Sequence, residues 1–225
     1  MKKVSILALA VSVLLISCQG SGGDKTTTTS EQQVAEQKGT TYTVDKTQSS
    51  LKWKGYHKGG FDPRIGTVQS EGTVAVENGA ITGGSFIIDI NSILTDASSV
   101  DVKKTEGKTS LDLDGHLKSG DFFEAHKYPT AKFEITSIGD FDETKDKSVI
   151  AGANQIISGN LTIKDKTVNV TFPAKVNVTD KHVSVESKFT IKRQDWGLTY
   201  GTDGDPRDWG ISQEVDIELN IQATK

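Results

Sequence analysis

The sequence predicts an all-β domain of about eight strands, built either as an antiparallel sandwich or as a closed barrel. Three observations support this prediction. Apolar and polar residues alternate with a period of two in many short segments, short polar turns separate these segments, and no long segment has the 3.6-residue period of an amphipathic helix. The domain extends over residues 42–225, a length that suits one hydrophobic core.

Each predicted strand is recognised by the apolar residues that share one of its faces. The first contains Leu51, Trp53 and Gly55, which alternate with polar neighbours. The later faces consist of Val74 and Val76; Phe86, Ile88 and Ile90; Ala131, Phe133 and Ile135; Leu161 and Ile163; Val168, Val170 and Phe172; Val183, Val185, Phe189 and Ile191; and Val215, Ile217, Leu219 and Ile221. The Asn78-Gly79 dipeptide predicts a hairpin turn, and Asp165-Lys166 predicts a second one.

Residues 95–129 form a polar stretch that is too long for a simple hairpin loop. Part of it, about residues 110–119, predicts a short helix with Leu111, Leu113 and Leu117 among its apolar positions. The aromatic pair Phe122-Phe123 argues against disorder. We interpret this stretch as a lid over one end of the barrel.

The N-terminus predicts export and lipid attachment. Residues 1–17 have the charged start and the short apolar core of a signal peptide, and this core is too short for a membrane-spanning helix. The run Leu15-Ile16-Ser17-Cys18 resembles a bacterial lipobox, in which the cysteine thiol is diacylated. Cys18 is the only cysteine, and a lone thiol in an exported protein indicates chemical use. The alternative is an ordinary signal peptide that contains a cysteine.

Residues 18–41 are expected to form a lipidated flexible tether, because they contain few apolar residues and, up to Thr41, no aromatic one. Such a tether would reach about 25 Å. Cleavage removes two of the 26 basic side chains and none of the 30 acidic ones, so the net charge falls from −4 to −6. This balance argues against nucleic acid or an anionic surface as a partner, and it leaves the lipid as the anchor.

Five motifs, in chain order, resemble those of the YceI-like family. They are Tyr42–Asp45 with Ser49–Trp53; Ser92–Thr95; His116–Phe123 with Tyr128–Phe133; Gly159–Lys164; and Lys192–Gly197. The resemblance covers the domain from Tyr42 to about Ala223. This chain departs from the secreted form of the family through its lipobox and tether, and its Trp196 stands where many relatives have another aromatic residue.

The resemblance implies a lipocalin-like, eight-stranded antiparallel β-barrel outside the cytoplasm. Its apolar cavity would hold a long isoprenoid chain, such as a polyprenyl phosphate or a quinone tail. Each buried methylene contributes up to about 0.8 kcal/mol, so such a tail binds without polar contacts. The expected ligand-binding residues are Trp53, Phe86, Ile88, Phe122, Phe133, Ile135, Leu161, Ile163, Phe172, Phe189, Ile191 and Arg193. The alternative is that the apolar members only pack against one another as core.

Arg193 has two interpretations. Counting by twos from Val185 places it on the apolar face at a strand end, where an isolated charge is costly. The first interpretation is a salt bridge to Asp114, Asp121 or Asp195 that holds the lid. The alternative is a ligand contact, because a guanidinium suits a phosphate or quinone oxygen at the cavity mouth.

Other polar clusters are expected to be structural. His116 and His126 flank the lid aromatics without the spacing of a zinc site, so we expect hydrogen bonds within the lid. Asp203-Gly204-Asp205 hints at a calcium loop, but Arg207 occupies the place of the third acidic ligand and a polar turn is expected. Residues 57–60 are interpreted as a turn at a strand end.

Three functions remain open. The sequence lacks a nucleophile elbow, a zinc helix motif, a phosphate-cradling glycine loop and CxxC, so we expect a binding protein with no metal or cofactor and no catalysis. The first function is a lipid-anchored protein that holds an isoprenoid or other long-chain lipid. The second is a structural or interaction lipoprotein with a filled barrel. The third is an enzyme that acts on a lipid or quinone.

The cell envelope is the expected location. Gln19 follows Cys18 in place of the aspartate that retains lipoproteins in the inner membrane of enteric bacteria. The outer membrane is therefore expected, with the barrel facing the periplasm or the outside. A free strand edge or an apolar patch would allow a homodimer.

Overall fold

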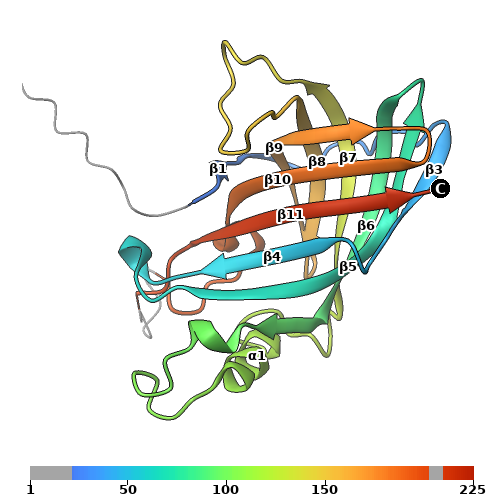
Figure 1. Ribbon diagram of the computed structural model, residues 1–225. Coiled ribbons are helices and arrows are strands. Elements are labelled where there is room, and N and C mark those ends of the chain that lie inside the picture. Colours follow the sequence, from blue (N-terminus) through green and yellow to red (C-terminus); the bar gives the residue numbers. More distant parts are fainter. Residues whose placement is uncertain (1–21, 203–209) are drawn as a thin grey trace, which may run out of the picture.

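A computed structural model, which describes residues 22–202 and 210–225, contains a closed eight-stranded antiparallel barrel (Figure 1). Its strands are β3 (Thr40–Val44) with β4 (Ser50–Gly55), β5 (Arg64–Glu77), β6 (Ala80–Thr95), β7 (Thr130–Asp140), β8 (Gln155–Ile163), β9 (Lys166–Val178), β10 (His182–Lys192) and β11 (Glu214–Thr224). β3 and β4 together fill one position, because each pairs with both β5 and β11. The barrel alternative is thus confirmed over the sandwich.

The two predicted turns are tight hairpins. Asn78 and Gly79 have φ values of 53° and 79°, which is the left-handed backbone that a two-residue hairpin turn requires. Between β8 and β9 the turn residues are Lys164 and Asp165, because Ile163 pairs with Lys166. That turn therefore lies one residue earlier than Asp165-Lys166.

The two ends of the barrel differ. We call the end where β6 finishes and β7 begins the lid end. It carries η1 (Lys58–Gly60), η2 (Ala97–Ser99), α1 (Ser110–Lys118) and η3 (Arg193–Trp196). The opposite end, with the turns from β5 to β6 and from β9 to β10, is the hairpin end. Within the described part of the chain, no helix has the length and apolar character needed to cross a membrane.

The lid is ordered, and its helix matches the predicted one. A capping box fixes the start of α1, since the Thr109 backbone N–H and hydroxyl both donate to Asp112. Asp114, which is buried, accepts hydrogen bonds from the backbone N–H of Thr95 at 2.8 Å and from its hydroxyl at 2.6 Å. This carboxylate therefore ties the lid to the end of β6.

The segment before the barrel differs from the expected free tether. Residues 22–39, which we call the strap, run across the outside of the barrel (Figure 1). Within the strap, β1 (Asp24–Lys25) pairs in parallel with β10, and β2 (Thr27–Thr29) pairs antiparallel with β9. Farther along, the strap bonds to Asn160 of β8, to the carbonyl of Ile135 in β7 and to Thr82 of β6.

Backbone hydrogen bonds, and not apolar burial, hold the strap in place. A composition low in apolar residues therefore gave the wrong expectation, although the run of β-branched threonines favours an extended strand. Beneath the strap, outward-facing polar residues are buried. Asp216 accepts from the backbone N–H of Gly22 at 2.8 Å and from the Thr190 hydroxyl at 2.7 Å, and it is only 3% exposed.

The strap enters a split between β9 and β10. These strands pair with each other only from Lys175 to Val178 and from Val183 to Glu186. Pro173 explains the split, because proline has no N–H to donate to a neighbouring strand. The Ser187 hydroxyl donates to the Pro173 carbonyl at 2.7 Å, and β1 and β2 satisfy the separated strand edges.

A cavity inside the barrel as the candidate functional site

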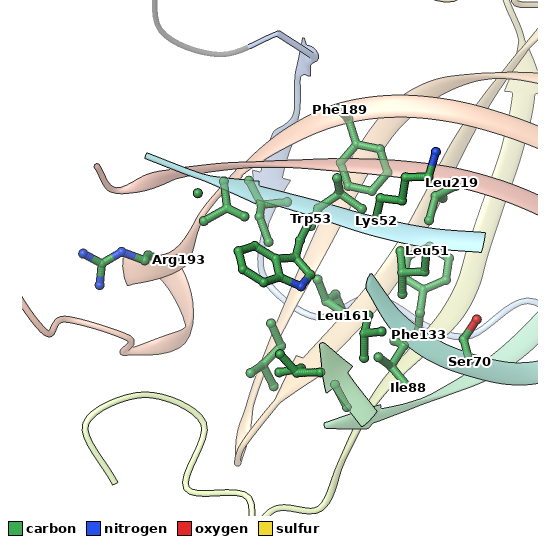
Figure 2. Close-up of a pocket in the computed structure, with 18 of the residues that line it drawn as sticks. Leu51, Lys52, Trp53, Ser70, Ile88, Phe133, Leu161, Phe189, Arg193 and Leu219 are labelled. Carbon is green, nitrogen blue, oxygen red and sulfur yellow. The ribbon is translucent and has the colours of Figure 1, made fainter. Parts of the chain in front are cut away.

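The barrel encloses an apolar cavity of about 400 Å³. This volume lies within the range of about 300–1,000 Å³ found for ligand pockets. Inward-facing side chains of every strand from β4 to β11 contribute to it, because alternate residues of a strand point to the same face. Figure 2 shows Trp53, Leu51, Leu161, Ile88 and Phe133 converging on this space.

All twelve residues that the sequence singled out line the cavity. They come from β4, β6, β7, β8, β9 and β10, from the start of η3 and from the lid. Their contact with a ligand stays a prediction. The residues are Trp53, Phe86, Ile88, Phe122, Phe133, Ile135, Leu161, Ile163, Phe172, Phe189, Ile191 and Arg193.

The cavity is blind at the hairpin end. There the buried side chains of Tyr42, Val44, Val76 and Val183 belong to the packed core and do not line the cavity. Along the split between β9 and β10, the rings of Phe172 and Phe189 stack with centroids 4.1 Å apart and close the seam from inside. At the lid end, by contrast, the lining includes the partly exposed side chains of His57 and Asp62.

Three side-chain polar atoms lack a hydrogen-bond partner although they are buried, and all three belong to cavity residues. They are Nε1 of Trp53, the hydroxyl of Tyr56 and Nη2 of Arg193. No other described side chain has such an atom. Leaving a buried donor unsatisfied costs about 1–3 kcal/mol, and an unpaired buried group calls for an explanation.

Arg193 lies at the lid end of the cavity, with its guanidinium directed away from Trp53 (Figure 2). It is 5% exposed, and burial lowers the pKa of Arg193. Nε donates to the Ser212 carbonyl at 2.9 Å and Nη1 to the Leu198 carbonyl at 2.6 Å. The guanidinium also lies 5.9 Å from the ring centroid of Phe122 in the lid.

The expected salt bridge of Arg193 is wrong for the three carboxylates considered. Within the described residues, Asp114 bonds to Thr95 and Asp121 to His116, and neither these two nor Asp195 forms an ion pair with Arg193. Backbone carbonyl oxygens partner the buried guanidinium instead, and Nη2 is left without a hydrogen-bond partner.

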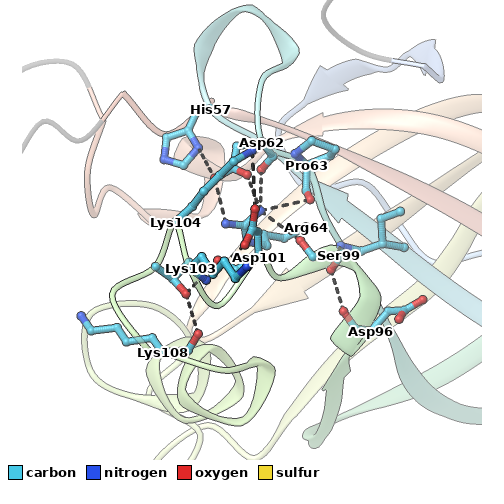
Figure 3. A network of polar contacts seen from close by, with 12 residues as sticks. His57, Asp62, Pro63, Arg64, Asp96, Ser99, Asp101, Lys103, Lys104 and Lys108 are labelled. Carbon is cyan, nitrogen blue, oxygen red and sulfur yellow. Dashed lines mark hydrogen bonds and ion pairs between the residues drawn. The ribbon is translucent and has the colours of Figure 1, made fainter.

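A second polar group at the lid end was missed by the sequence analysis. Arg64 donates through Nη1 and Nη2 to the two carboxylate oxygens of Asp62, each at 2.8 Å, and through Nη1 to the Ser99 carbonyl at 3.1 Å (Figure 3). His57 Nδ1 lies 3.9 Å from Asp62, and these three side chains line the cavity. The Arg64 hydrogen bonds hold the pKa of Asp62 below its usual value.

This group could not be found from periodicity, because its members come from a turn. Residues 57–60 do form a turn, η1, as expected, but His57 also faces the cavity. The feature of the sequence that could have indicated this polar group is the close spacing of His57, Asp62 and Arg64 beside the first predicted strand. The Ile65 backbone N–H donates to the Ser99 hydroxyl at 3.2 Å, which links η2 to the start of β5.

The remaining candidates have structural contacts or lie outside the described residues. His116 bonds to Asp121 at 3.0 Å and packs edge-on against Phe122, which confirms the hydrogen bond expected within the lid. Among residues 22–202 and 210–225, no three His, Cys, Asp or Glu side chains are grouped to hold a metal ion. Cys18 and the Asp203–Asp205 turn lie outside the described residues.

Comparison with known proteins shows which sequences this chain resembles. Residues 42–223 match the family model of the YceI-like domain. UPF0312 protein PA0423 of Pseudomonas aeruginosa is 30% identical over 150 residues, which are 63% of this chain and 70% of the relative. Protein YceI of Escherichia coli O157:H7 is 31% identical over 149 residues, with the same two coverages.

Two solved structures share the fold. BcnA of Burkholderia cenocepacia superimposes with a TM-score of 0.57 at 21% identity, covering 80% of this chain and 99% of that chain. A polyisoprenoid binding domain from Saccharophagus degradans superimposes with a TM-score of 0.53 at 17% identity, covering 85% and 99% of the two chains. At these identities the likeness shows the fold alone.

Proposed function

Because the chain belongs to the YceI-like family, we propose that its barrel binds the chain of a long isoprenoid lipid, such as a polyprenyl phosphate or a quinone-type lipid. The observation that carries the proposal is the cavity itself, whose apolar wall surrounds three unpaired polar atoms. The likeness to a solved polyisoprenoid binding domain supports the same ligand class.

The wall and the unpaired atoms suit different parts of such a ligand. The tail would gain up to about 0.8 kcal/mol for each methylene that it buries against residues such as Phe133 and Leu161. An oxygen-bearing headgroup would lie at the lid end, within reach of Arg193 and Tyr56. A guanidinium with a free Nη2 favours phosphate or carbonyl oxygens.

We further propose that a lipid on Cys18 holds the protein in the bacterial cell envelope, at the outer membrane, with the barrel on the periplasmic or the external side. The lipobox supports this location. The homodimer stays a prediction.

Binding is favoured over a filled barrel and over catalysis. A cavity of about 400 Å³ argues against a barrel that side chains fill completely. The titratable groups His57, Asp62 and Arg64 contact one another at the rim instead of facing a common point inside the apolar space. That arrangement supports a structural role, in which these side chains hold together the segments at the lid end of the cavity.

Organic extraction and mass spectrometry test the proposed ligand. A Cys18→Ala chain, recovered from the soluble fraction of the exporting host, should yield a polyprenyl or quinone-type lipid. Ile88→Trp should lose most of this lipid, because the larger side chain enters the cavity. Ile87→Trp is the matched control, since Ile87 is the neighbouring residue on β6 and lies on the opposite face.

The outcome is decisive in either direction. Retention by Ile87→Trp and loss by Ile88→Trp, with both variants folded by circular dichroism, would assign the lipid to the cavity. Extracts of the parent chain that are repeatedly free of long-chain lipid would contradict the proposal and favour the structural lipoprotein.

A further inference from the structure

The strap leaves a very short connection to the proposed lipid. Only Gln19, Gly20 and Ser21 lie between Cys18 and Gly22, whose backbone N–H is bonded to Asp216. Four residue steps of extended chain span at most about 14 Å. The lipid therefore has little freedom relative to β10 and β11, in contrast to a free tether that begins at residue 42.

This connection starts near the lid end. β1 pairs with Phe189 and Thr190, which lie only a few residues before η3, and β1 lies toward the same end of the barrel as η1 (Figure 1). From Phe189 to His182 at the hairpin end, the strand covers seven residue steps, about 23 Å. A connection of about 14 Å reaches past the lid end but does not reach the hairpin end.

Exposed apolar side chains gather at the same end. Seven large apolar side chains are exposed in the described residues, and five of them belong to lid-end segments. Phe61 and Leu111 are the most exposed, at 72% and 71%. The five, which we call the apolar rim, are Phe61, Ile65, Leu94, Val102 and Leu111.

From these two observations we propose that the apolar rim docks on the phospholipid surface that carries the Cys18 lipid, so that the cavity opens toward the bilayer. The proposal rests on the lipid anchor put forward above. A long-chain lipid could then pass from the bilayer into the cavity without crossing a wide layer of water. Such a crossing is unfavourable, because it exposes the apolar chain to water.

The charges around the rim indicate which interaction drives docking. Lys103, Lys104 and Lys108 alternate with Asp101 and Glu106, so the loop before α1 is nearly balanced. Electrostatic attraction to anionic lipid is therefore small, and burial of Phe61 and Leu111 among the headgroups supplies the contact. Docking should accordingly persist at high salt.

Single-cysteine labelling of the full, acylated chain tests the docking. Phe61→Cys and Leu111→Cys place a fluorescent maleimide on the rim, and Lys181→Cys places it in the exposed turn at the hairpin end. An acylated Cys18 takes up no label. In vesicles of phosphatidylethanolamine and phosphatidylglycerol that contain doxyl-labelled phosphatidylcholine, both rim labels should be quenched several-fold more strongly than the Lys181→Cys label.

A spacer variant then tests the role of the short connection. Sixteen Gly/Ser residues inserted between Ser21 and Gly22 leave every described contact intact. Quenching at Phe61→Cys should fall by about twofold or more, because the effective concentration of the rim at the bilayer falls with tether length.

The outcomes separate docking from anchoring. Equal quenching at the rim and at Lys181→Cys, or no quenching at either, in a chain that floats with the vesicles would overturn the docking and leave the anchor standing. A parent chain that takes up maleimide through a free Cys18 thiol and does not float would overturn the anchor, and the docking with it.

Discussion

At the scale of single residues, the cavity combines an apolar wall with polar atoms that the protein itself does not satisfy. Tyr56 shows this most simply, because its ring packs in the wall while its buried hydroxyl, close to Ser212 and Glu214, lacks a hydrogen bond of good geometry. Burial, followed by the negative charges of Asp216 and Glu214, raises the pKa of Tyr56, so the phenol stays a neutral donor. A donor kept in this state suits an oxygen acceptor on a ligand.

Tyr56→Phe should separate headgroup binding from tail binding. It removes one hydroxyl and little volume, so the ligand-free protein should keep its free energy of unfolding or gain up to about 1 kcal/mol. Affinity for a polyprenyl phosphate should fall by about three- to tenfold, the equivalent of one hydrogen bond. Isothermal calorimetry with the phosphate and with the matching headless hydrocarbon measures both effects. An equal loss of affinity for the two lipids would contradict a headgroup contact of Tyr56.

Residue periodicity predicted the apolar wall of the cavity but not the polar group at its lid end. The inward positions follow from strict alternation along strands, which is why Phe86, Phe133 and Phe189 all line the cavity. Asp62 and Arg64 reach it through a turn, and turn geometry depends on the packing of η1 and η2 and not on a repeating pattern. Likewise, the partners of Arg193 are backbone carbonyls, which no side-chain motif records.

At the scale of elements, the strap acts as a partial ninth strand that covers the split made by Pro173. The sequence contains a separate indication of the split and of the strap that covers it. A proline inside a strand argues for an edge position, and a run of threonines favours an extended segment. No local sequence pattern indicates that these two segments pair, because β2 and β9 are more than a hundred residues apart. The pairing depends on the closed barrel.

Gly23→Val should release the start of the strap. A Cβ at residue 23 would lie 2.7 Å from the backbone of Phe189, whereas at residue 22 it would lie 3.4 Å from Asp216, so Gly22→Ala is the matched control. Loss of two or three hydrogen bonds should lower the free energy of unfolding by about 1–3 kcal/mol. Hydrogen exchange should increase at Thr190 and along the freed edge of β9. Unchanged protection in Gly23→Val would contradict the role of the strap.

At the scale of the whole molecule, we expect the barrel to fold without the proposed anchor. The strap begins at Gly22, after the proposed lipid site, and every barrel contact lies downstream of it. In the proposed function, anchoring and ligand binding are thus assigned to separate parts of the chain. This division stays a prediction, and within the described residues the paired fold starts at the strap, before the domain start expected at Tyr42.

Cys18→Ala should therefore release a folded, ligand-competent protein into the soluble fraction. Its melting temperature should match that of the acylated chain within about 1 °C, because Cys18 precedes all described contacts. Differential scanning calorimetry and cell fractionation measure the two properties. A variant that stays with the membrane, or that melts well below the acylated chain, would show that the N-terminus does more than anchor.

The bond between Gly22 and Asp216 joins residues that are 194 positions apart. Under the proposed export, the chain crosses the membrane with its N-terminus first, so the strap arrives long before β9, β10 and β11. It has no strand edge to pair with until those strands exist, and contacts this distant in sequence form slowly. The first described residues to arrive are therefore among the last to be placed, and the barrel is sealed only after the whole chain has been delivered.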